Sequence, residues 1–194
     1  MSRTAFLRLE WLLSAALVVL SVAWSALRDV PLGTRLVPSA GLVAAGVVAG
    51  AALWGTIPLL LRAPSMQRVW REILQPFSAT LATRDMVVIA TLSGLTEELF
   101  FRGILLPELG LVTSSLCFGV LHALCATYFV WATAVGAGMS ALTLATSSLV
   151  TPMVAHATYN LGALLLLRRA AQRPAPATAT AAIDSTIASP HGIG

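Results

Sequence analysis

The sequence predicts an all-α integral membrane protein, with about six transmembrane helices and one amphipathic helix at the membrane surface. Hydrophobic residues make up 57% of the chain and charged residues only 10%, and the mean hydropathy is +0.85. A soluble globular domain carries about 25% charged residues, so the composition excludes that class. The apolar residues also gather in runs close to the roughly 20 residues that a helix needs to cross a bilayer.

The net charge of +4 comes from arginine, since the chain contains no lysine. We interpret the arginines as anchors to anionic lipid headgroups, so the bilayer itself is an expected partner. No nucleic-acid-binding motif is present, and nucleic acid is not expected as a partner. Cys117 and Cys125 fall on one expected helix, about 12 Å apart by helical rise alone, which is too far for a disulfide.

The first two expected spans cover residues 11–27 and 41–61. Arginines precede the first span, and Ala23-Trp24-Ser25 offers small residues at the spacing of a signal-peptide cleavage site. A cleaved signal peptide is therefore the alternative interpretation. We favour an uncleaved span, because the later spans need it for their topology. The second span is rich in Gly and Ala, which permits close helix packing.

Residues 65–81 differ from the spans, because their apolar residues recur at helical spacing and polar residues fill the other face. Ser65, which follows Pro64, is the expected N-cap. This pattern predicts an amphipathic helix that lies at the membrane interface with its arginines on headgroups. A helix packed against the other spans is the alternative.

Four further spans are expected, over residues 86–106, 111–129, 131–145 and 150–167. Pro107 closes the first of these four. Residues 1–169 are thus expected to form a single transmembrane catalytic domain. The remaining residues, 170–194, are mainly Ala, Pro, Thr and Ser, and we expect a disordered tail.

The distribution of arginine predicts the orientation of the chain. Six spans place both termini on one side of the membrane, and that side collects nine arginines against two on the other. The nine are Arg3, Arg8, Arg62, Arg68, Arg71, Arg84, Arg168, Arg169 and Arg173, and the two are Arg28 and Arg35. By the positive-inside rule, both termini are expected to be cytoplasmic.

Three ionisable residues interrupt the span 86–106: Glu97, Glu98 and Arg102. An ionised side chain near mid-membrane costs at least about 2.5–3.5 kcal/mol on insertion scales, so the cluster needs a reason. Glu98 and Arg102 are i,i+4 neighbours on a helix and can neutralise each other. Glu97 lies about 100° round the helix and cannot share that bond equally well. We therefore expect one structural carboxylate and one free carboxylate.

Polar side chains in two other spans fall at a depth similar to that of Glu97. They are His122, His156 and Asn160, and we expect all four to line one cavity, with Glu97 and His122 within about 6 Å of each other. His156 and Asn160 are i,i+4 neighbours, so both can point donors at the oxyanion of an attacked peptide carbonyl. Taken singly, each residue has a structural interpretation, such as a histidine bonded to a backbone carbonyl or an asparagine joining two helices.

At these residues the sequence resembles a known family. Glu97-Glu98-x-x-x-Arg102, Phe118-x-x-x-His122 and His156-x-x-x-Asn160 are similar to the three signature motifs of the CPBP family. That family groups CAAX proteases with bacteriocin-processing and self-immunity (Abi) proteins, and its characterised members are glutamic intramembrane proteases.

The resemblance implies a role for each motif residue. Glu97 and His122 would activate the attacking water, and His156 and Asn160 would stabilise the oxyanion. Glu98 and Arg102 would support these residues, and Phe118 would pack beneath His122. No metal or other cofactor is implied. The substrate would be a membrane-anchored protein or peptide, and compact relatives, the myxosortases, are thought to trim C-terminal sorting anchors. The lysine-free, Ala-rich composition suits a high-GC bacterium and hence an inner membrane.

The residues leave other functions open. Two glutamates and two histidines are also a possible zinc-ligand set, which would make the protein a metalloprotease; the sequence has no His-Glu-x-x-His motif and no Gly-x-Ser-x-Gly motif. Glutamate and histidine at mid-membrane also form proton relays in transporters and channels. A non-catalytic immunity protein on the same fold would differ only by lacking turnover.

Overall fold

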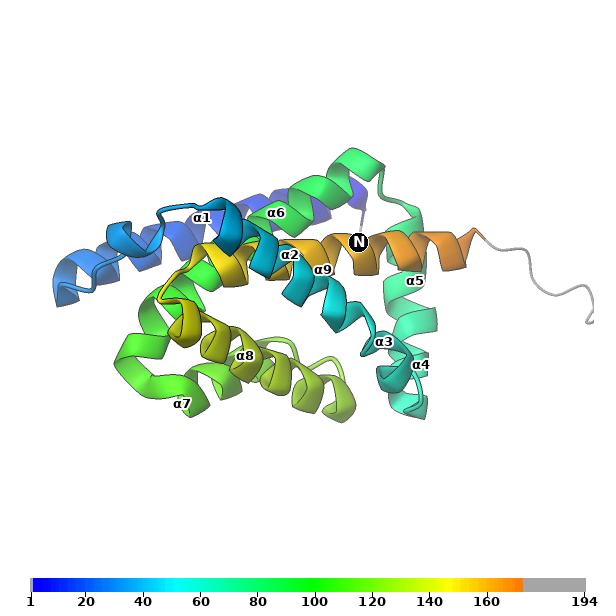
Figure 1. Ribbon diagram of the computed structural model, residues 1–194. Helices are drawn as coiled ribbons and strands as arrows, with labels where there is room; N and C mark the ends of the chain where they lie inside the picture. The colour runs from blue at the N-terminus through cyan, green and yellow to red at the C-terminus, as the bar shows by residue number, and fades with distance from the viewer. Residues whose placement is uncertain (1, 173–194) are drawn as a thin grey trace, which may run out of the picture.

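The computed structural model describes residues 2–172, and within that range all regular structure is helical. The elements are α1 (Arg3–Arg28), the short 3-10 turn η1 (Gly33–Arg35), α2 (Ala40–Trp54), α3 (Ile57–Leu60), α4 (Pro64–Val69), the π turn η2 (Trp70–Leu74), α5 (Gln75–Ala79), α6 (Thr83–Phe100), the π turn η3 (Phe101–Leu105), α7 (Leu106–Leu121), α8 (Ala126–Thr146) and α9 (Val150–Ala171). In Figure 1 α9 runs through the middle of the bundle, with α2 across it, α1 and α6 above it and α7 and α8 below it. The predicted all-α class is confirmed.

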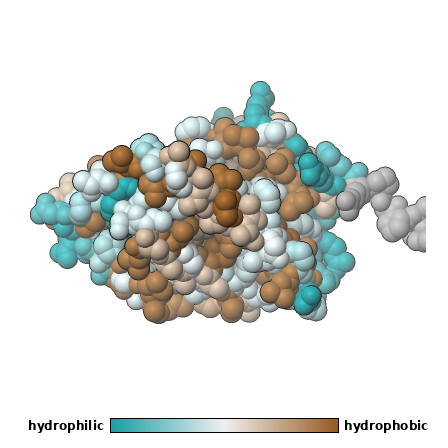
Figure 2. Space-filling model, viewed as in Figure 1, coloured by the Kyte–Doolittle hydropathy of each residue, from teal (hydrophilic) through white to brown (hydrophobic). Residues whose placement is uncertain are grey.

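Five helical segments between residues 2 and 172 are long and apolar enough to cross a membrane. They begin at Arg3, Ala40, Thr83, Ala126 and Val150. Figure 2 shows hydrophobic residues over the middle of one face and hydrophilic residues mainly towards its two ends. An apolar band between polar ends is the surface that a bilayer requires, so the predicted integral membrane class is confirmed as well.

Five segments rather than six meet this description, because Thr83–Leu121 takes in both the third and the fourth expected spans, which are separated by non-helical backbone at Gly110. Pro107 does not end the helix; it lies in the first turn of α7, directly after the π turn η3. A proline removes one backbone donor and crowds the preceding turn, and the wider π turn accommodates it. The chain reverses at Gly110 instead, where φ is 78°. Glycine adopts this left-handed conformation without the steric cost that a Cβ adds.

The boundary between the fourth and fifth expected spans is also corrected. The fourth was expected to run to residue 129, but α7 ends at Leu121 and His122 is its C-cap. Nδ1 of His122 bonds the carbonyl oxygen of Phe118 at 2.8 Å, which satisfies one of the free carbonyls at a helix end. Cys125 is extended, and α8 therefore starts at Ala126 rather than at residue 131.

The first helix starts at Arg3 rather than at residue 11, because Ser2 caps it. The Ser2 side chain accepts a hydrogen bond from the backbone of Ala5 at 3.2 Å. Arg3 then pairs with Asp85 of α6, with 2.6 Å between Nη2 and Oδ1. Further along, the hydroxyls of Ser14 and Thr96 lie 3.5 Å apart. These contacts make α1 and α6 parallel neighbours in a fixed register.

The segment expected to lie at the membrane interface is helical as the continuous segment α4–η2–α5, which crosses the end of the bundle at a steep angle to the long helices (Figure 1). Its N-cap is Ala63, with Pro64 in the first turn, so the expected cap at Ser65 is wrong. Ser65 instead shares a hydrogen bond with Thr127 at 2.9 Å. The apolar side chains of Met66 and Val69 are buried against the protein, while the arginines of this segment stay exposed.

The last helix extends beyond its expected end. α9 continues through the arginine pair at 168–169 to Ala171, so the first residues of the expected tail are helical. Residues 173–194 lie outside the part of the chain that the structure describes, so the disorder expected for them stays a prediction.

The contact between α6 and α9 positions the polar residues of both helices. The two helices are antiparallel, since Thr83 meets Arg168 near one end and Glu98 meets His156 further along. Gly94 allows their close approach, because a Cβ at this position would lie 2.8 Å from the backbone nitrogen of Ala157. Small residues at helix contacts of this kind are typical of membrane proteins.

Candidate active site

Glu98 and Arg102 form the predicted ion pair inside the bundle. Nη1 of Arg102 donates to Oε1 of Glu98 at 2.8 Å, and the side chains are 1% and 0% exposed, respectively. Nη2 donates to the backbone carbonyl of Gly136 in α8 at 3.0 Å. The guanidinium carbon also lies 4.6 Å from the centre of the Phe118 ring. Arg102 thus neutralises Glu98 and ties α6 to α7 and α8.

Glu98 has a second partner that the sequence spacing could not predict. Nδ1 of His156 lies 2.7 Å from Oε1 of Glu98. A carboxylate can only accept, so Nδ1 carries the proton in this contact and Nε2 is the ring nitrogen left for a ligand. The buried carboxylate therefore fixes the tautomer and orientation of His156, as well as pairing with Arg102.

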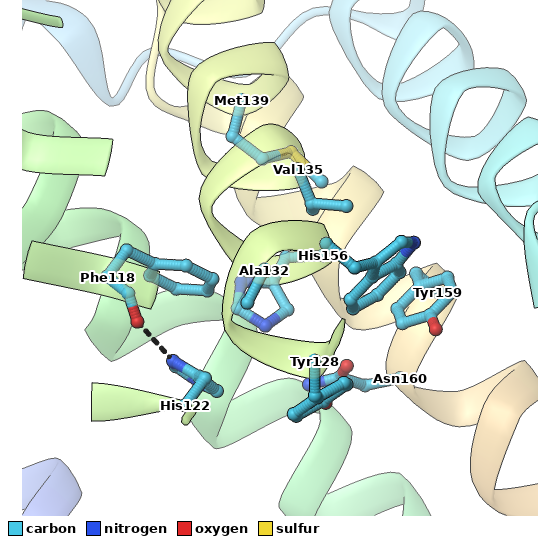
Figure 3. A pocket seen from close by; sticks show the side chains of 10 residues that line it. Phe118, His122, Tyr128, Ala132, Val135, Met139, His156, Tyr159 and Asn160 are labelled. Carbon is cyan, nitrogen blue, oxygen red and sulfur yellow. Dashed lines mark hydrogen bonds between the residues drawn. The ribbon is translucent and has the colours of Figure 1, made fainter. Parts of the chain in front are cut away.

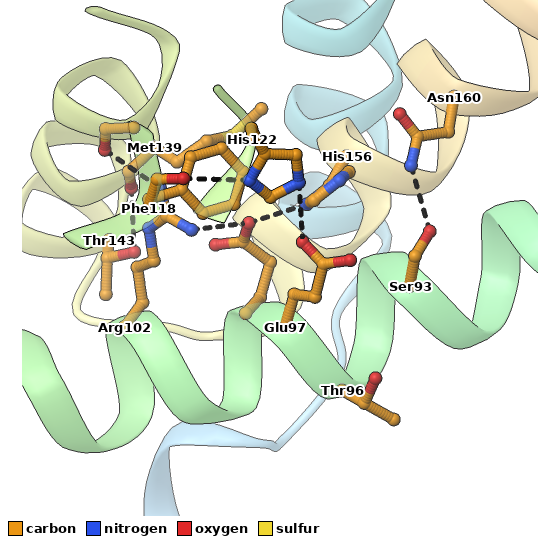
Figure 4. A network of polar contacts seen from close by, with 12 residues as sticks. Ser93, Thr96, Glu97, Arg102, Phe118, His122, Met139, Thr143, His156 and Asn160 are labelled. Carbon is orange, nitrogen blue, oxygen red and sulfur yellow. Dashed lines mark hydrogen bonds and ion pairs between the residues drawn. The ribbon is translucent and has the colours of Figure 1, made fainter. Parts of the chain in front are cut away.

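Glu97, by contrast, faces His122. Its Oε2 lies 3.5 Å from Nε2 of His122, within the range predicted for two residues that share a water (Figure 4). Nδ1 of His122 donates to the Phe118 carbonyl, which leaves Nε2 as an acceptor in the neutral ring. The Phe118 ring stacks on the His122 ring, with centroids 4.2 Å apart. Phe118 therefore holds His122 through both its backbone and its side chain.

Asn160 lies farther along α9, towards the end of the bundle where Thr83 and Arg168 meet. Its Nδ2 donates to the Ser93 hydroxyl at 2.9 Å (Figure 4). Ser93 is one helical turn before Glu97 on α6. The sequence pattern did not single out Ser93, although a serine in an apolar span is a signal for such a contact.

Three of the four expected residues, His122, His156 and Asn160, line a cavity of about 140 Å³ (Figure 3). Aromatic side chains supply much of the remaining wall, namely Phe118, Tyr128, Trp131 and Tyr159. We name this space the aromatic cavity. A polar group or two in an aromatic wall is the usual composition of a site for an organic ligand.

Glu97 lines a different cavity, so the four residues do not share one space as expected. That cavity, of about 320 Å³, lies between α1, α6 and the end of α7. His122 lines both cavities and forms part of the wall between them. The helical face of Glu97, about 100° from that of Glu98, accounts for the division. The two sides of His122 thus differ, with aromatic groups on one side and a carboxylate on the other.

The possible zinc ligands do not gather. Among residues 2–172, no three His, Cys, Asp or Glu side chains are grouped so that they could hold a metal ion. Glu98 and His156 share one contact, and Glu97 and His122 share another.

Residues 79–162 match the model of one protein family, described as type II CAAX prenyl endopeptidase Rce1-like. The matched stretch contains all seven expected site residues. The match supports the CPBP family that the three motifs indicate. The CAAX-protease family is one of peptide hydrolases, and the protein is thus a CAAX-type intramembrane protease. No match was found among curated proteins, and none among solved structures.

Proposed function

We propose that this CPBP protein is a metal-independent glutamic endopeptidase, in which Glu97 and His122 activate the water that attacks a peptide bond. The observation that supports it most is the unequal use of two adjacent carboxylates. Glu98 is held by Arg102 and His156, whereas Glu97 has, among residues 2–172, only His122 within ion-pairing distance. A general base must be free to take a proton, and of these two carboxylates it is Glu97 that meets this condition.

The contact between Glu97 and His122 suits a bound water. In the neutral His122 ring Nδ1 carries the proton, so Nε2 is an acceptor. Nε2 faces Oε2 of ionised Glu97, which is also an acceptor. A water between them can donate one hydrogen to each. Glu97 Oε2 is buried and has no hydrogen bond from another group among residues 2–172, so it can accept one from water.

The reaction that follows is a hydrolysis without a covalent intermediate. The water oxygen attacks the carbonyl carbon while its proton passes to Glu97. Collapse of the tetrahedral intermediate breaks the carbon–nitrogen bond, and the departing nitrogen takes the proton back from Glu97. The chain itself is chemically unchanged after each turnover.

His156 and Asn160 are the proposed oxyanion donors. Both line the aromatic cavity, where a substrate carbonyl fits beside His122. Nε2 of His156 donates in the doubly protonated ring, in which Nδ1 keeps its hydrogen bond to the Glu98 carboxylate. Asn160 needs no protonation, because Nδ2 has two hydrogens and the Ser93 hydroxyl accepts one.

The proposed substrate is a membrane-anchored protein cut near its anchor, as the resemblance to myxosortases implies. We place the protein in a bacterial inner membrane with both termini cytoplasmic, on the strength of the arginine distribution. Figure 1 supports a common side for both ends, since α1 begins and α9 finishes towards the same end of the bundle.

A comparison of membrane-protein C-termini tests the proposal. Cells that express the wild-type chain should contain shortened C-termini that are missing from cells expressing Glu97→Gln at equal abundance. The substrate would be identified by the same measurement. Identical C-termini in the two strains would contradict a proteolytic role for Glu97.

A further inference from the structure

A third carboxylate faces the interior of the bundle. Glu10 belongs to α1, about 10 Å along the helix from Arg3, and it lines the same cavity as Glu97 and His122. None of the ion pairs or side-chain hydrogen bonds among residues 2–172 includes it. Ionisable residues inside membrane helices are rare, and they are usually paired or face a water-filled cavity.

The register of α1 against α6 places Glu10 relative to Glu97. Ser14 lies level with Thr96, and Arg3 with Asp85. Glu10 is one turn before Ser14, so it lies between Glu97 and the end of the bundle at which both helices begin. Helical side chains lean towards the N-terminus of their own helix, which brings the Glu97 carboxylate towards Glu10.

The cavity of about 320 Å³ is lined by both polar and apolar side chains. The polar side chains are Glu10, Ser14, Thr96, Glu97 and His122, and the apolar ones are Leu13, Leu17, Phe101 and Leu121. One water takes about 30 Å³ in the liquid and needs two to four polar partners. This cavity offers space and partners for several waters.

We propose that this cavity is the water chamber of the protease and that Glu10 is a positioning residue, which holds water beside Glu97 and His122. The inference rests on the proposed function for the use of that water. Hydrolysis consumes one water for each bond, and a peptide in the aromatic cavity would block access from that side of His122. The chamber reaches the Glu97–His122 pair from the opposite side.

Glu10 acts by accepting hydrogen bonds from water, and it takes no proton from the substrate. Glu97 receives the proton of the attacking water and returns it to the departing nitrogen, so no further base is required. A neutral acceptor of the same size should therefore replace Glu10. An apolar side chain should not.

Thiol reactivity measures the hydration of the chamber without reference to catalysis. In protein carrying Cys117→Ala and Cys125→Ala, Ser14→Cys should react with N-ethylmaleimide at least about tenfold faster than Ser21→Cys, because only a thiol reached by water forms the reactive thiolate. Ser21 is the matched control: it is a fully buried serine of the same helix and does not line the chamber.

Addition of Glu10→Leu should slow the labelling of Ser14→Cys by about tenfold, even though loss of a negative charge favours the thiolate. Ser14→Cys labelling no faster than that of Ser21→Cys, or labelling unaffected by Glu10→Leu, would overturn the water chamber.

Cleavage kinetics test the positioning role. Glu10→Leu should lower kcat by about tenfold with KM unchanged, whereas Glu10→Gln should retain most of kcat. Glu108→Gln is the control, since Glu108 pairs with Arg28 outside the chamber. The melting temperature of each variant shows whether a lower kcat comes from a destabilised fold or from loss of bound water. A wild-type kcat for Glu10→Leu, or equal losses of kcat in Glu10→Leu and Glu10→Gln, would contradict the positioning role of Glu10. Cleavage by Glu97→Gln would instead contradict the proposed function and would leave the labelling result intact.

Discussion

At the scale of single residues, Glu97 and Glu98 are neighbours in sequence with different partners. Glu98 neutralises Arg102 and orients His156, and Glu97 meets His122. One residue of helical rotation causes this difference, and it predicts that the two glutamates fail in different ways when replaced.

Glu98→Gln should destabilise the protein, because it leaves Arg102 buried without a counter-charge. Breaking a buried ion pair costs about 3–5 kcal/mol, so the variant should accumulate poorly in membranes. The double variant Glu98→Gln with Arg102→Met should recover abundance, since no charge remains unpaired.

Cleavage by that double variant should nevertheless stay low, because the hydrogen bond from Nδ1 of His156 to an amide oxygen is weaker than the bond to a carboxylate and orients the ring less firmly. Quantitative immunoblotting and cleavage assays on the same membranes check both points. Full cleavage by the double variant would mean that Glu98 has no part in orienting His156.

Asn160→Ala should leave abundance unchanged and lower kcat by about 10²–10³, the usual loss for one oxyanion donor. Ser93→Ala removes only the acceptor that orients the Asn160 amide, so its loss should be smaller. Single-turnover cleavage rates of the purified variants measure both. Equal losses for the two variants would indicate that Asn160 acts only as a contact between α6 and α9.

At the scale of elements, the approach of α6 to α9 sets the distance between Glu98 and His156. Gly94→Ala should lower both the melting temperature and the cleavage rate, because its Cβ would lie 2.8 Å from the backbone of Ala157. Gly138→Ala in α8 is the matched control, since a Cβ there meets nothing within 4 Å. A Gly94→Ala variant as stable and active as Gly138→Ala would show that the two helices can separate without cost.

The element scale also shows what the sequence can and cannot predict. Apolar runs located the long helices, because bilayer thickness fixes their length. The break between α7 and α8 was missed, because His122 and Cys125 are not helix breakers by type and the break depends on a side chain capping a carbonyl. The sequence predicts a helix end at Pro107, since a pattern cannot show the π turn that accommodates the proline.

In the candidate site, contacts within one helix could be predicted from the sequence, and contacts between helices could not. The Glu98–Arg102 pair follows from i,i+4 spacing on one helix. The bond between Glu98 and His156 joins helices far apart in sequence, and no local spacing encodes it. Glu10 was missed because the first helix starts earlier than its apolar run, so a residue before that run became part of the bundle.

At the scale of the whole molecule, the proposed chemistry needs no metal. Cleavage by the purified protein should be unchanged after treatment with EDTA or 1,10-phenanthroline and after reconstitution with zinc. A known zinc protease in the same lipid and detergent provides the control for effective chelation. Loss of cleavage on chelation, followed by recovery with zinc alone, would establish the metalloprotease alternative.

The central claim is that Glu97 is the general base, and Glu97→Gln tests it most directly. Glutamine keeps the shape of the side chain but cannot take a proton from water at neutral pH. The measurement is the cleavage rate per molecule of protein, with wild type and variant quantified in the same membranes. We expect Glu97→Gln to accumulate normally and to lose cleavage. Cleavage at the wild-type rate by this variant would contradict the account.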